Sequence, residues 1–374
     1  MKAVLRTGAL WGLIIAVSMT GCSSEDDGDD TPPEPEYRYY AYVANRNSYD
    51  LSAYTINTST GALTAIAGSP FPMGYHYYNS IAVSPTGKFI YVPNSMTNNV
   101  SALAISSLSG SVTAVAGSPF AAGSYPRSVA IDPAGQFLFV ANLTSADISA
   151  YTINASTGAL TEIGGSPFAA GSFADSVTVD PTGKFAYVTT ESPAGVSGLT
   201  INPSTGALTG IAGSPFAAGS TTSVAVDPTA KFAYVADFML NHVSAFAIDP
   251  STGALTEIAG SPFATESGPI SVLMDPAGKY VYVMNDLSHD VNAYAIDAST
   301  GALTEIAGSP LSTGLGVSAS FDPTGKFVYA LNSQANNVTA YALDAATGVL
   351  TEIAGSPFPS GERPMAIATI RVKQ

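Results

Sequence analysis

The chain has 374 residues, of which 46% are hydrophobic and only 11% are charged, and its formal net charge at pH 7 is −15. With 13 Lys and Arg against 28 Asp and Glu, the composition argues against a nucleic-acid surface, which needs clustered cations. The single Cys excludes an internal disulfide. The 35 Gly, 25 Pro and 19 Tyr favour short strands joined by tight turns over helices.

Residues 1–21 are predicted to be a lipoprotein signal peptide. Lys2 and Arg6 precede an apolar stretch over 9–19, and small residues lead to Cys22. The apolar stretch is short for a membrane span. The segment resembles a bacterial lipoprotein box, which implies cleavage at Cys22 and its lipidation, with the protein anchored in the cell envelope, at the outer membrane or cell surface. The alternative is an ordinary signal peptide that contains a cysteine.

Residues 22–37 are predicted to be a disordered tether. The stretch over 23–36 reads SSEDDGDDTPPEPE, which is acidic, rich in Pro and without an apolar period. Such a composition cannot bury enough apolar surface to fold. The predicted folded body therefore spans 38–371.

An internal repeat dominates the body. The tripeptide Gly-Ser-Pro occurs seven times, beginning at Gly68, Gly117, Gly165, Gly213, Gly260, Gly308 and Gly355. A period of this length is typical of propellers and other repeat architectures.

One repeat contains four β-prone segments. In the third copy they span 128–132, 137–142, 148–154 and 160–164, separated by Gly-, Pro- and Asn-rich turns, which predicts a four-stranded antiparallel sheet. The first turn, Asp132-Pro133-Ala134-Gly135, has type I chemistry. Its aspartate recurs at Asp180, Asp227, Asp275 and Asp322, with Ser84 in the second copy. We interpret this ring of aspartates as turn residues and predict no metal site.

Seven such sheets packed radially predict an all-β protein, a seven-bladed β-propeller of four-stranded antiparallel blades. The body opens at 39–45 with a match to the second strand of the repeat and closes at 364–370 with a match to the first. The C-terminal strand is therefore expected to complete the N-terminal blade, which covers an edge that would otherwise recruit other chains.

Segments such as 185–189 (FAYVT) and 91–94 (YVPN), which follow Asp/Ser-Pro-x-Gly-Lys turns, resemble the YVTN-type repeat. That group includes bacterial surface-layer propellers and lactonase-like propellers related to 6-phosphogluconolactonase and 3-carboxymuconate cyclase. The likeness covers residues 38–371 and implies the fold more specifically than the activity.

The loops entering the first strand and those joining strands two and three should share one face, the top face. They vary between copies, which makes this face the expected place for a site. The residues that precede the first strands form the predicted channel mouth: Asn79, Arg127, Asp175, Thr222, Ile270, Val317 and Met365. Three neighbouring blades thus present polar residues there, and the opposite blades present apolar ones.

Ligand-binding residues predicted at this mouth are Asn79, Arg127 and Asp175, with Tyr75, Tyr77, Tyr78 and Tyr125 on neighbouring loops. Arg127 suits a carboxylate or phosphate, and the tyrosines suit stacking on a sugar or peptide. The alternative for Arg127 is a surface ion pair with Asp175.

The resemblance implies His, Glu and several Arg on the top face of the lactonase-like enzymes, whereas Arg is scarce here. His76 is the candidate base and Arg127 its candidate catalytic partner; an exposed loop histidine is the alternative for His76. His242 and His289 are interpreted as turn residues.

The sequence thus favours first an envelope-anchored binding or scaffold module for a small-molecule, glycan, peptide or protein ligand at the top face. The alternative is a lactonase-like hydrolase of sugar-acid lactones, and a third reading is a structural surface-layer role. No cofactor and no nucleic-acid partner are predicted.

Overall fold

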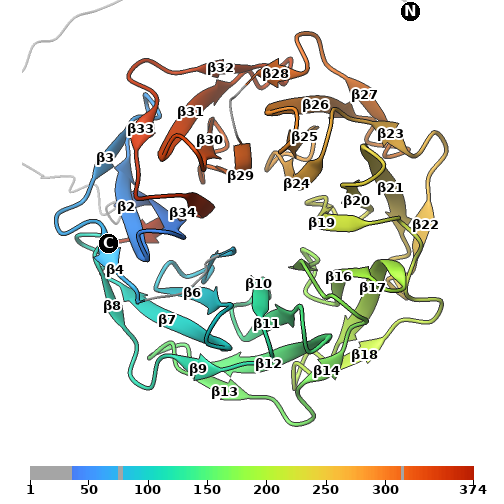
Figure 1. Ribbon diagram of the computed structural model, residues 1–374, viewed down its shortest axis with the longest axis horizontal. Coiled ribbons are helices and arrows are strands. Elements are labelled where there is room, and N and C mark those ends of the chain that lie inside the picture. The colour runs from blue at the N-terminus through green and yellow to red at the C-terminus, as the bar shows by residue number, and fades with distance from the viewer. Residues whose placement is uncertain (1–35, 75–78, 313–315) are drawn as a thin grey trace, which may run out of the picture. The chain divides into compact units, whose positions relative to one another are not determined.

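The repeat folds into seven β-sheets arranged around a central channel (Figure 1). The computed structural model describes residues 36–74, 79–312 and 316–374, and within these ranges it contains strands and turns but no helix. Accordingly, no helix in the described part of the chain is long and apolar enough to span a membrane. The predicted seven-bladed, all-β propeller is confirmed.

The strands nearest the channel are β34 (Pro364–Lys373) in blade 1 and then, from blade 2 to blade 7, β5 (Ala82–Val83), β10 (Pro126–Ile131), β15 (Val177–Val179), β19 (Thr221–Val226), β24 (Pro269–Met274) and β29 (Gly316–Phe321). The second strands, in the same order, are β1 (Tyr37–Asn45), β6 (Phe89–Asn94), β11 (Phe137–Asn142), β16 (Phe185–Glu191), β20 (Phe232–Asp237), β25 (Tyr280–Asn285) and β30 (Phe327–Asn332).

The third strands are β2 (Asp50–Ile56), β7 (Asn99–Ile105), β12 (Asp147–Ile153), β17 (Ala194–Ile201), β21 (His242–Ile248), β26 (Asp290–Ile296) and β31 (Asn337–Leu343). The outer strands are β3 (Leu63–Ala65), β8 (Val112–Ala114), β13 (Leu160–Glu162), β18 (Leu208–Gly210), β22 (Leu255–Glu257), β27 (Leu303–Glu305) and β32 (Leu350–Glu352).

The Gly-Ser-Pro tripeptide interrupts the outer strand. In six blades a two-residue strand follows it and pairs with the third strand: β4 (Phe71–Pro72), β9 (Phe120–Ala121), β14 (Phe168–Ala169), β23 (Phe263–Ala264), β28 (Leu311–Ser312) and β33 (Phe358–Pro359). In blade 4 a single bridge between Val196 and Phe216 takes this place. The serine hydroxyl fills the gap, since Ser69 Oγ accepts the N–H of Ala53 in the third strand at 2.8 Å. Each blade is therefore four strands wide, with a broken outer edge.

The ring closes through its two ends. Strand β34 pairs antiparallel with β1, from Tyr37 opposite Lys373 to Asn45 opposite Pro364. The predicted closure is confirmed, and it leaves the inner edge of β1 covered rather than open to another chain.

The repeated aspartates are turn residues, as predicted. Asp132 Oδ1 accepts the N–H groups of Gln136 and Phe137, both at 2.6 Å. Asp180, Asp227, Asp275 and Asp322 make the equivalent pair of bonds.

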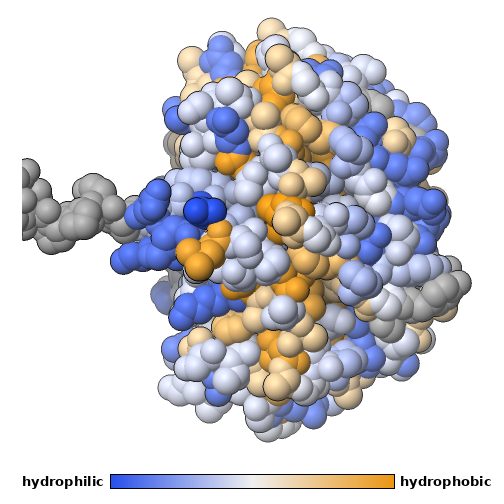
Figure 2. All heavy atoms as spheres, turned by 90° about the vertical axis from the view of Figure 1, so that its left-hand side faces the viewer, coloured by the Kyte–Doolittle hydropathy of each residue, from blue (hydrophilic) through white to orange (hydrophobic). Residues whose placement is uncertain are grey.

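Neighbouring blades are joined by apolar clusters and by a ring of tyrosine hydrogen bonds. Six tyrosines of the second strands donate their hydroxyl to a glycine carbonyl of the next blade, at 2.7–2.9 Å: Tyr42, Tyr91, Tyr187, Tyr234, Tyr282 and Tyr329. Burial raises the pKa of these phenols, so they remain donors. Blade 3 carries Phe139 at this position. These tyrosines recur at one position of the repeat and therefore pack between blades. The outer wall, seen edge-on, shows an apolar strip between polar borders (Figure 2).

Candidate active site

A cavity of about 790 Å³ occupies the top mouth of the channel and is lined by residues from all seven blades. The seven residues predicted at the mouth all line it: Asn79, Arg127, Asp175, Thr222, Ile270, Val317 and Met365. The polar residues of blades 2 to 4 therefore face the apolar residues of blades 6, 7 and 1 across one cavity.

Directly below the mouth lies a row of serines. Six blades place a serine immediately after the mouth residue, and all six line the cavity: Ser80, Ser128, Ser176, Ser223, Ser271 and Ser318. Three of these hydroxyls accept a backbone N–H of a neighbouring first strand, as Ser128 Oγ does from Val177 at 3.1 Å. The sequence analysis missed this row, although the position recurs in the repeat. Blade 1 has Ala366 there.

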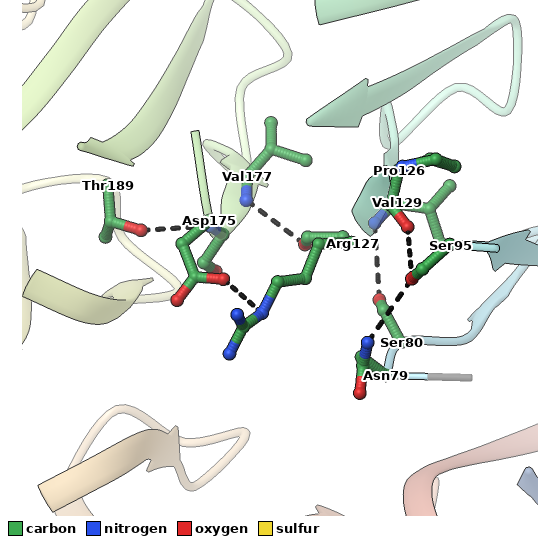
Figure 3. A network of polar contacts seen from close by, with 11 residues as sticks. Asn79, Ser80, Ser95, Pro126, Arg127, Val129, Asp175, Val177 and Thr189 are labelled. Carbon is green, nitrogen blue, oxygen red and sulfur yellow. Dashed lines mark hydrogen bonds and ion pairs between the residues drawn. The ribbon is translucent and has the colours of Figure 1, made fainter. Parts of the chain in front are cut away.

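Arg127 and Asp175 form an ion pair inside the cavity. Arg127 Nε contacts Asp175 Oδ1 across the boundary between blades 3 and 4 (Figure 3). The Arg127 side chain is 43% exposed and the Asp175 side chain 12%. The ion-pair alternative for Arg127 is therefore present, and because the pair uses Nε, both terminal amino groups of the guanidinium remain as donors.

Hydrogen bonds fix the main chain around the pair, from the same blade at Asp175 and from the neighbouring blade before Arg127. The N–H of Asp175 donates to the carbonyl of Thr189 at 3.0 Å (Figure 3). Buried Ser95 donates to the carbonyl of Pro126, one residue before Arg127, at 2.7 Å, and Asn79 Nδ2 donates to Ser95 Oγ at 3.4 Å (Figure 3). Arg127 is thus held in strand β10, and Asp175 is held in the segment that leads into β15.

The environment of Asp175 favours the neutral form of its carboxyl group. Burial raises its pKa to about 6; the positive charge of Arg127 opposes the rise and the negative charge of Glu191 adds to it. A carboxyl with a pKa near 6 is a stronger base than an ordinary aspartate, yet is ionised at pH 7. Perturbed carboxyls of this kind concentrate at functional sites.

Further charges surround the opening. Asp286, Glu362 and Arg363 line the cavity in addition to the ion pair. Asp286 directly follows β25, and Glu362 and Arg363 directly precede β34. None of these three residues was predicted in the site from the sequence. The loops that carry these three residues reach the mouth because the closed ring places the top loops of blades 6 and 1 around the same opening.

The family of lactonases with a seven-bladed β-propeller matches residues 36–173 and 176–318. The chain belongs to this family. No curated protein sequence matches this lactonase-family chain.

Solved structures share the fold of this lactonase-family protein. A proposed 6-phosphogluconolactonase of Bacteroides uniformis has a TM-score of 0.78 at 19% identity, over 89% of this chain and 99% of the other. A proposed 6-phosphogluconolactonase of Bacteroides fragilis has a TM-score of 0.76 at 22% identity, over 89% and 98%. The periplasmic gluconolactonase of Pseudomonas aeruginosa has a TM-score of 0.73 at 15% identity, over 89% and 99%. At these identities the likeness establishes the fold.

The structure does not test several of the predicted residues. Tyr75, His76, Tyr77 and Tyr78 fall outside the described residues, as does Cys22, so their roles stay predictions. Tyr125 is described, but it is half-buried and is not among the residues found lining the cavity. Its N–H donates to Asn98 Oδ1 at 2.8 Å, and its φ is +58°. Tyr125 thus shapes the loop that precedes Arg127.

The two other histidines are absent from the cavity lining found for the described residues. His289 occupies a turn position with φ +62°, which confirms its interpretation. His242 instead begins strand β21, with Nε2 3.8 Å from Oδ2 of buried Asp237. Within the described ranges, no group of three or more His, Cys, Asp or Glu is placed to hold a metal ion.

Proposed function

We propose that the protein hydrolyses sugar-acid lactones in the mouth cavity, with Asp175 as general base and Arg127 as the group that binds the developing oxyanion. The observation that carries this proposal is the Arg127–Asp175 pair, which places a carboxylate of pKa about 6 beside exposed guanidinium donors in a large cavity. Membership of the lactonase family supports it. The comparisons favour this function over the binding module that the sequence alone placed first.

In the proposed reaction, the Asp175 carboxylate takes a proton from water while the water oxygen attacks the lactone carbonyl carbon. The carbonyl oxygen becomes an oxyanion, which the terminal N–H groups of Arg127 stabilise. Collapse of this intermediate breaks the ring C–O bond, and protonated Asp175 returns its proton to the leaving alkoxide. One water and one lactone thus give one hydroxy acid.

The serine row suits the rest of such a substrate. A hydroxyl that accepts one backbone N–H retains a proton to donate and a second lone pair to accept. Ser80, Ser128 and Ser223 are in this state. A polyhydroxylated lactone ring has the matching donors and acceptors.

The location of the activity is also a proposal. We infer that Cys22 carries a lipid that anchors the propeller in the cell envelope through the tether of residues 22–37. Metabolic labelling with an alkyne-bearing fatty acid should mark the wild-type protein, and Cys22→Ala should abolish the label. Unlabelled wild-type protein would contradict the anchor without bearing on the catalytic proposal.

The activity is tested on a panel of sugar lactones, with hydrolysis measured as the release of acid in weakly buffered solution. We expect turnover above buffer for wild type, and losses of about 10²-fold or more in kcat for Asp175→Asn and Arg127→Ala. His76→Ala tests the second candidate base, since retention of activity would leave Asp175 as the base.

Two matched controls come from sites away from the cavity. Asp344→Asn changes an exposed turn aspartate whose equivalents in other blades are Asn57, Asn154 and Asn202. Arg371→Ala removes an arginine that lies over the Tyr37 ring. Both should keep wild-type activity. Absence of turnover on every lactone, or full activity of Asp175→Asn, would overturn the proposed function.

A further inference from the structure

The charges around the cavity indicate which lactones it accepts. Among the described residues that line it, two are cationic and three are acidic. Arg127 is already paired with Asp175, which leaves Arg363 against Asp286 and Glu362. Residues 75–78 and 313–315, which shortly precede Asn79 and Val317 in the sequence, include no Lys or Arg.

A phosphate group is poorly served by this set of charges. Recognition of a phosphate dianion relies on several unpaired Arg or Lys donors. Asp175 neutralises the charge of Arg127, although the terminal amino groups of Arg127 remain as donors. The other charged residues described in the lining are Arg363, Asp286 and Glu362, so the net charge at the partly solvated opening is negative and a dianion experiences net repulsion. The lysines do not add positive charge at the mouth, because they follow the Asp-Pro and Ser-Pro turns at the opposite ends of the strands: Lys88, Lys184, Lys231, Lys279 and Lys326.

The remaining lining fits an uncharged molecule. The serine row presents neutral hydroxyls to the interior, and Ile270, Val317 and Met365 form an apolar wall opposite the ion pair. Sugar rings combine hydroxyl edges with apolar C–H faces, so both surfaces can be used by one neutral ring.

We propose that the cavity selects lactones without phosphate or another anionic group, and that Asp286 and Glu362 are the residues that exclude phosphorylated substrates. This inference rests on the proposed hydrolase function and narrows its substrate class. The acidic rim also repels the carboxylate product, which favours its departure after each turnover.

The test compares kcat/KM for D-glucono-δ-lactone and for its 6-phosphate at pH 7.5. Wild type should prefer the unphosphorylated lactone by about tenfold or more, and high salt should narrow the preference because exposed charges are screened. Charge reversal in Asp286→Lys/Glu362→Lys should raise kcat/KM for the phosphate and shrink or invert the ratio. The control pair Asp297→Asn/Asp344→Asn removes two exposed acids of other turns, and the ratio should stay at its wild-type value.

The outcomes separate the two proposals. Hydrolysis of both lactones with preference for the phosphate, or a ratio unmoved by the charge reversal, overturns the selectivity and leaves the hydrolase intact. Hydrolysis of neither overturns the hydrolase. In that case calorimetric binding of 1,5-anhydroglucitol and its 6-phosphate decides the selectivity: tighter binding of the neutral ring supports it, and tighter binding of the phosphate or binding of neither refutes it.

Discussion

Replacement of Asp175 by Asn should make the protein more stable while it destroys the proposed activity. Asp175 is ionised at pH 7 although its side chain is only 12% exposed. Burial, which Arg127 only partly offsets, raises its pKa from 3.8 to about 6. Asparagine keeps the size and an oxygen that can accept from Arg127, but it cannot ionise.

The magnitude follows from the pKa. In the unfolded chain the carboxyl titrates at its ordinary value, so between pH 3.8 and about 6 the folded state holds more protons than the unfolded state. The free energy of unfolding of wild type therefore falls as pH rises through this window. At 1.36 kcal/mol per pH unit, the full cost above pH 6 is about 3 kcal/mol. Below the window Asp175 is neutral in both states and the cost disappears.

Urea unfolding of wild type and Asp175→Asn from pH 4 to pH 8 measures this difference. The variant should gain stability relative to wild type as pH rises and reach a plateau of about 3 kcal/mol above pH 7. Asp344→Asn is the control, since backbone bonds from Ala346 and Thr347 lower the pKa of that exposed carboxyl and no such gain is expected. A difference that does not vary with pH, or a variant less stable than wild type at pH 8, would contradict the assignment of a buried, costly charge.

Three further predictions concern catalysis and the ring. If Asp175 is the base, kcat/KM for a lactone should fall by about tenfold per pH unit below pH 6 in a pH–rate profile, and Asp175→Asn should remove this dependence. Phe139→Tyr should raise the free energy of unfolding by about 1 kcal/mol, because the new hydroxyl reaches the Gly206 carbonyl, and Tyr234→Phe should lower it equally; unfolding curves that show no change for either would contradict the role of the tyrosine ring. Deletion of residues 364–374 should expose the edge of β1 and shift the wild-type peak in size-exclusion chromatography to aggregates, and a thermally stable deletion variant that does not aggregate would refute the closure.

Most of the fold follows from the repeat, because local chemistry repeats with it. Asp132 and its equivalents carry the turn bonds that their sequence predicts, and the match of 364–370 to a first strand predicted the pairing of β34 with β1. The interruption of the outer strand was not predicted. It depends on Ser69 and its equivalents reaching the third strand, a contact between residues 16 apart that no periodicity reveals.

The site was predictable only in part, for a geometric reason. The seven mouth residues occupy one repeat position, so the sequence brought them to one opening. Asp286, Glu362 and Arg363 belong to other positions, and only the ring geometry places them there. The raised pKa of Asp175 could not be predicted from the sequence either, since it depends on burial between blades 3 and 4 and on the charge of Glu191.

The position of the ion pair explains how a uniform scaffold acquires a specific site. Six blades place the same serine beneath the mouth, so this layer of the cavity is nearly symmetric and cannot by itself orient a substrate. An asymmetric site arises where two adjacent copies differ, as blades 3 and 4 do with Arg127 in β10 and Asp175 two residues before β15. Blade 3 has Phe139 in place of the tyrosine, so blades 3 and 4 are joined instead by an apolar cluster that includes Phe139 and Val177. Packing between the blades offsets the cost of the buried carboxylate. The double substitution Arg127→Asp/Asp175→Arg should keep an ion pair of the same net charge but exchange the positions of the base and the oxyanion-binding group. Lactone hydrolysis should depend on which blade carries which charge, and not only on the presence of the pair.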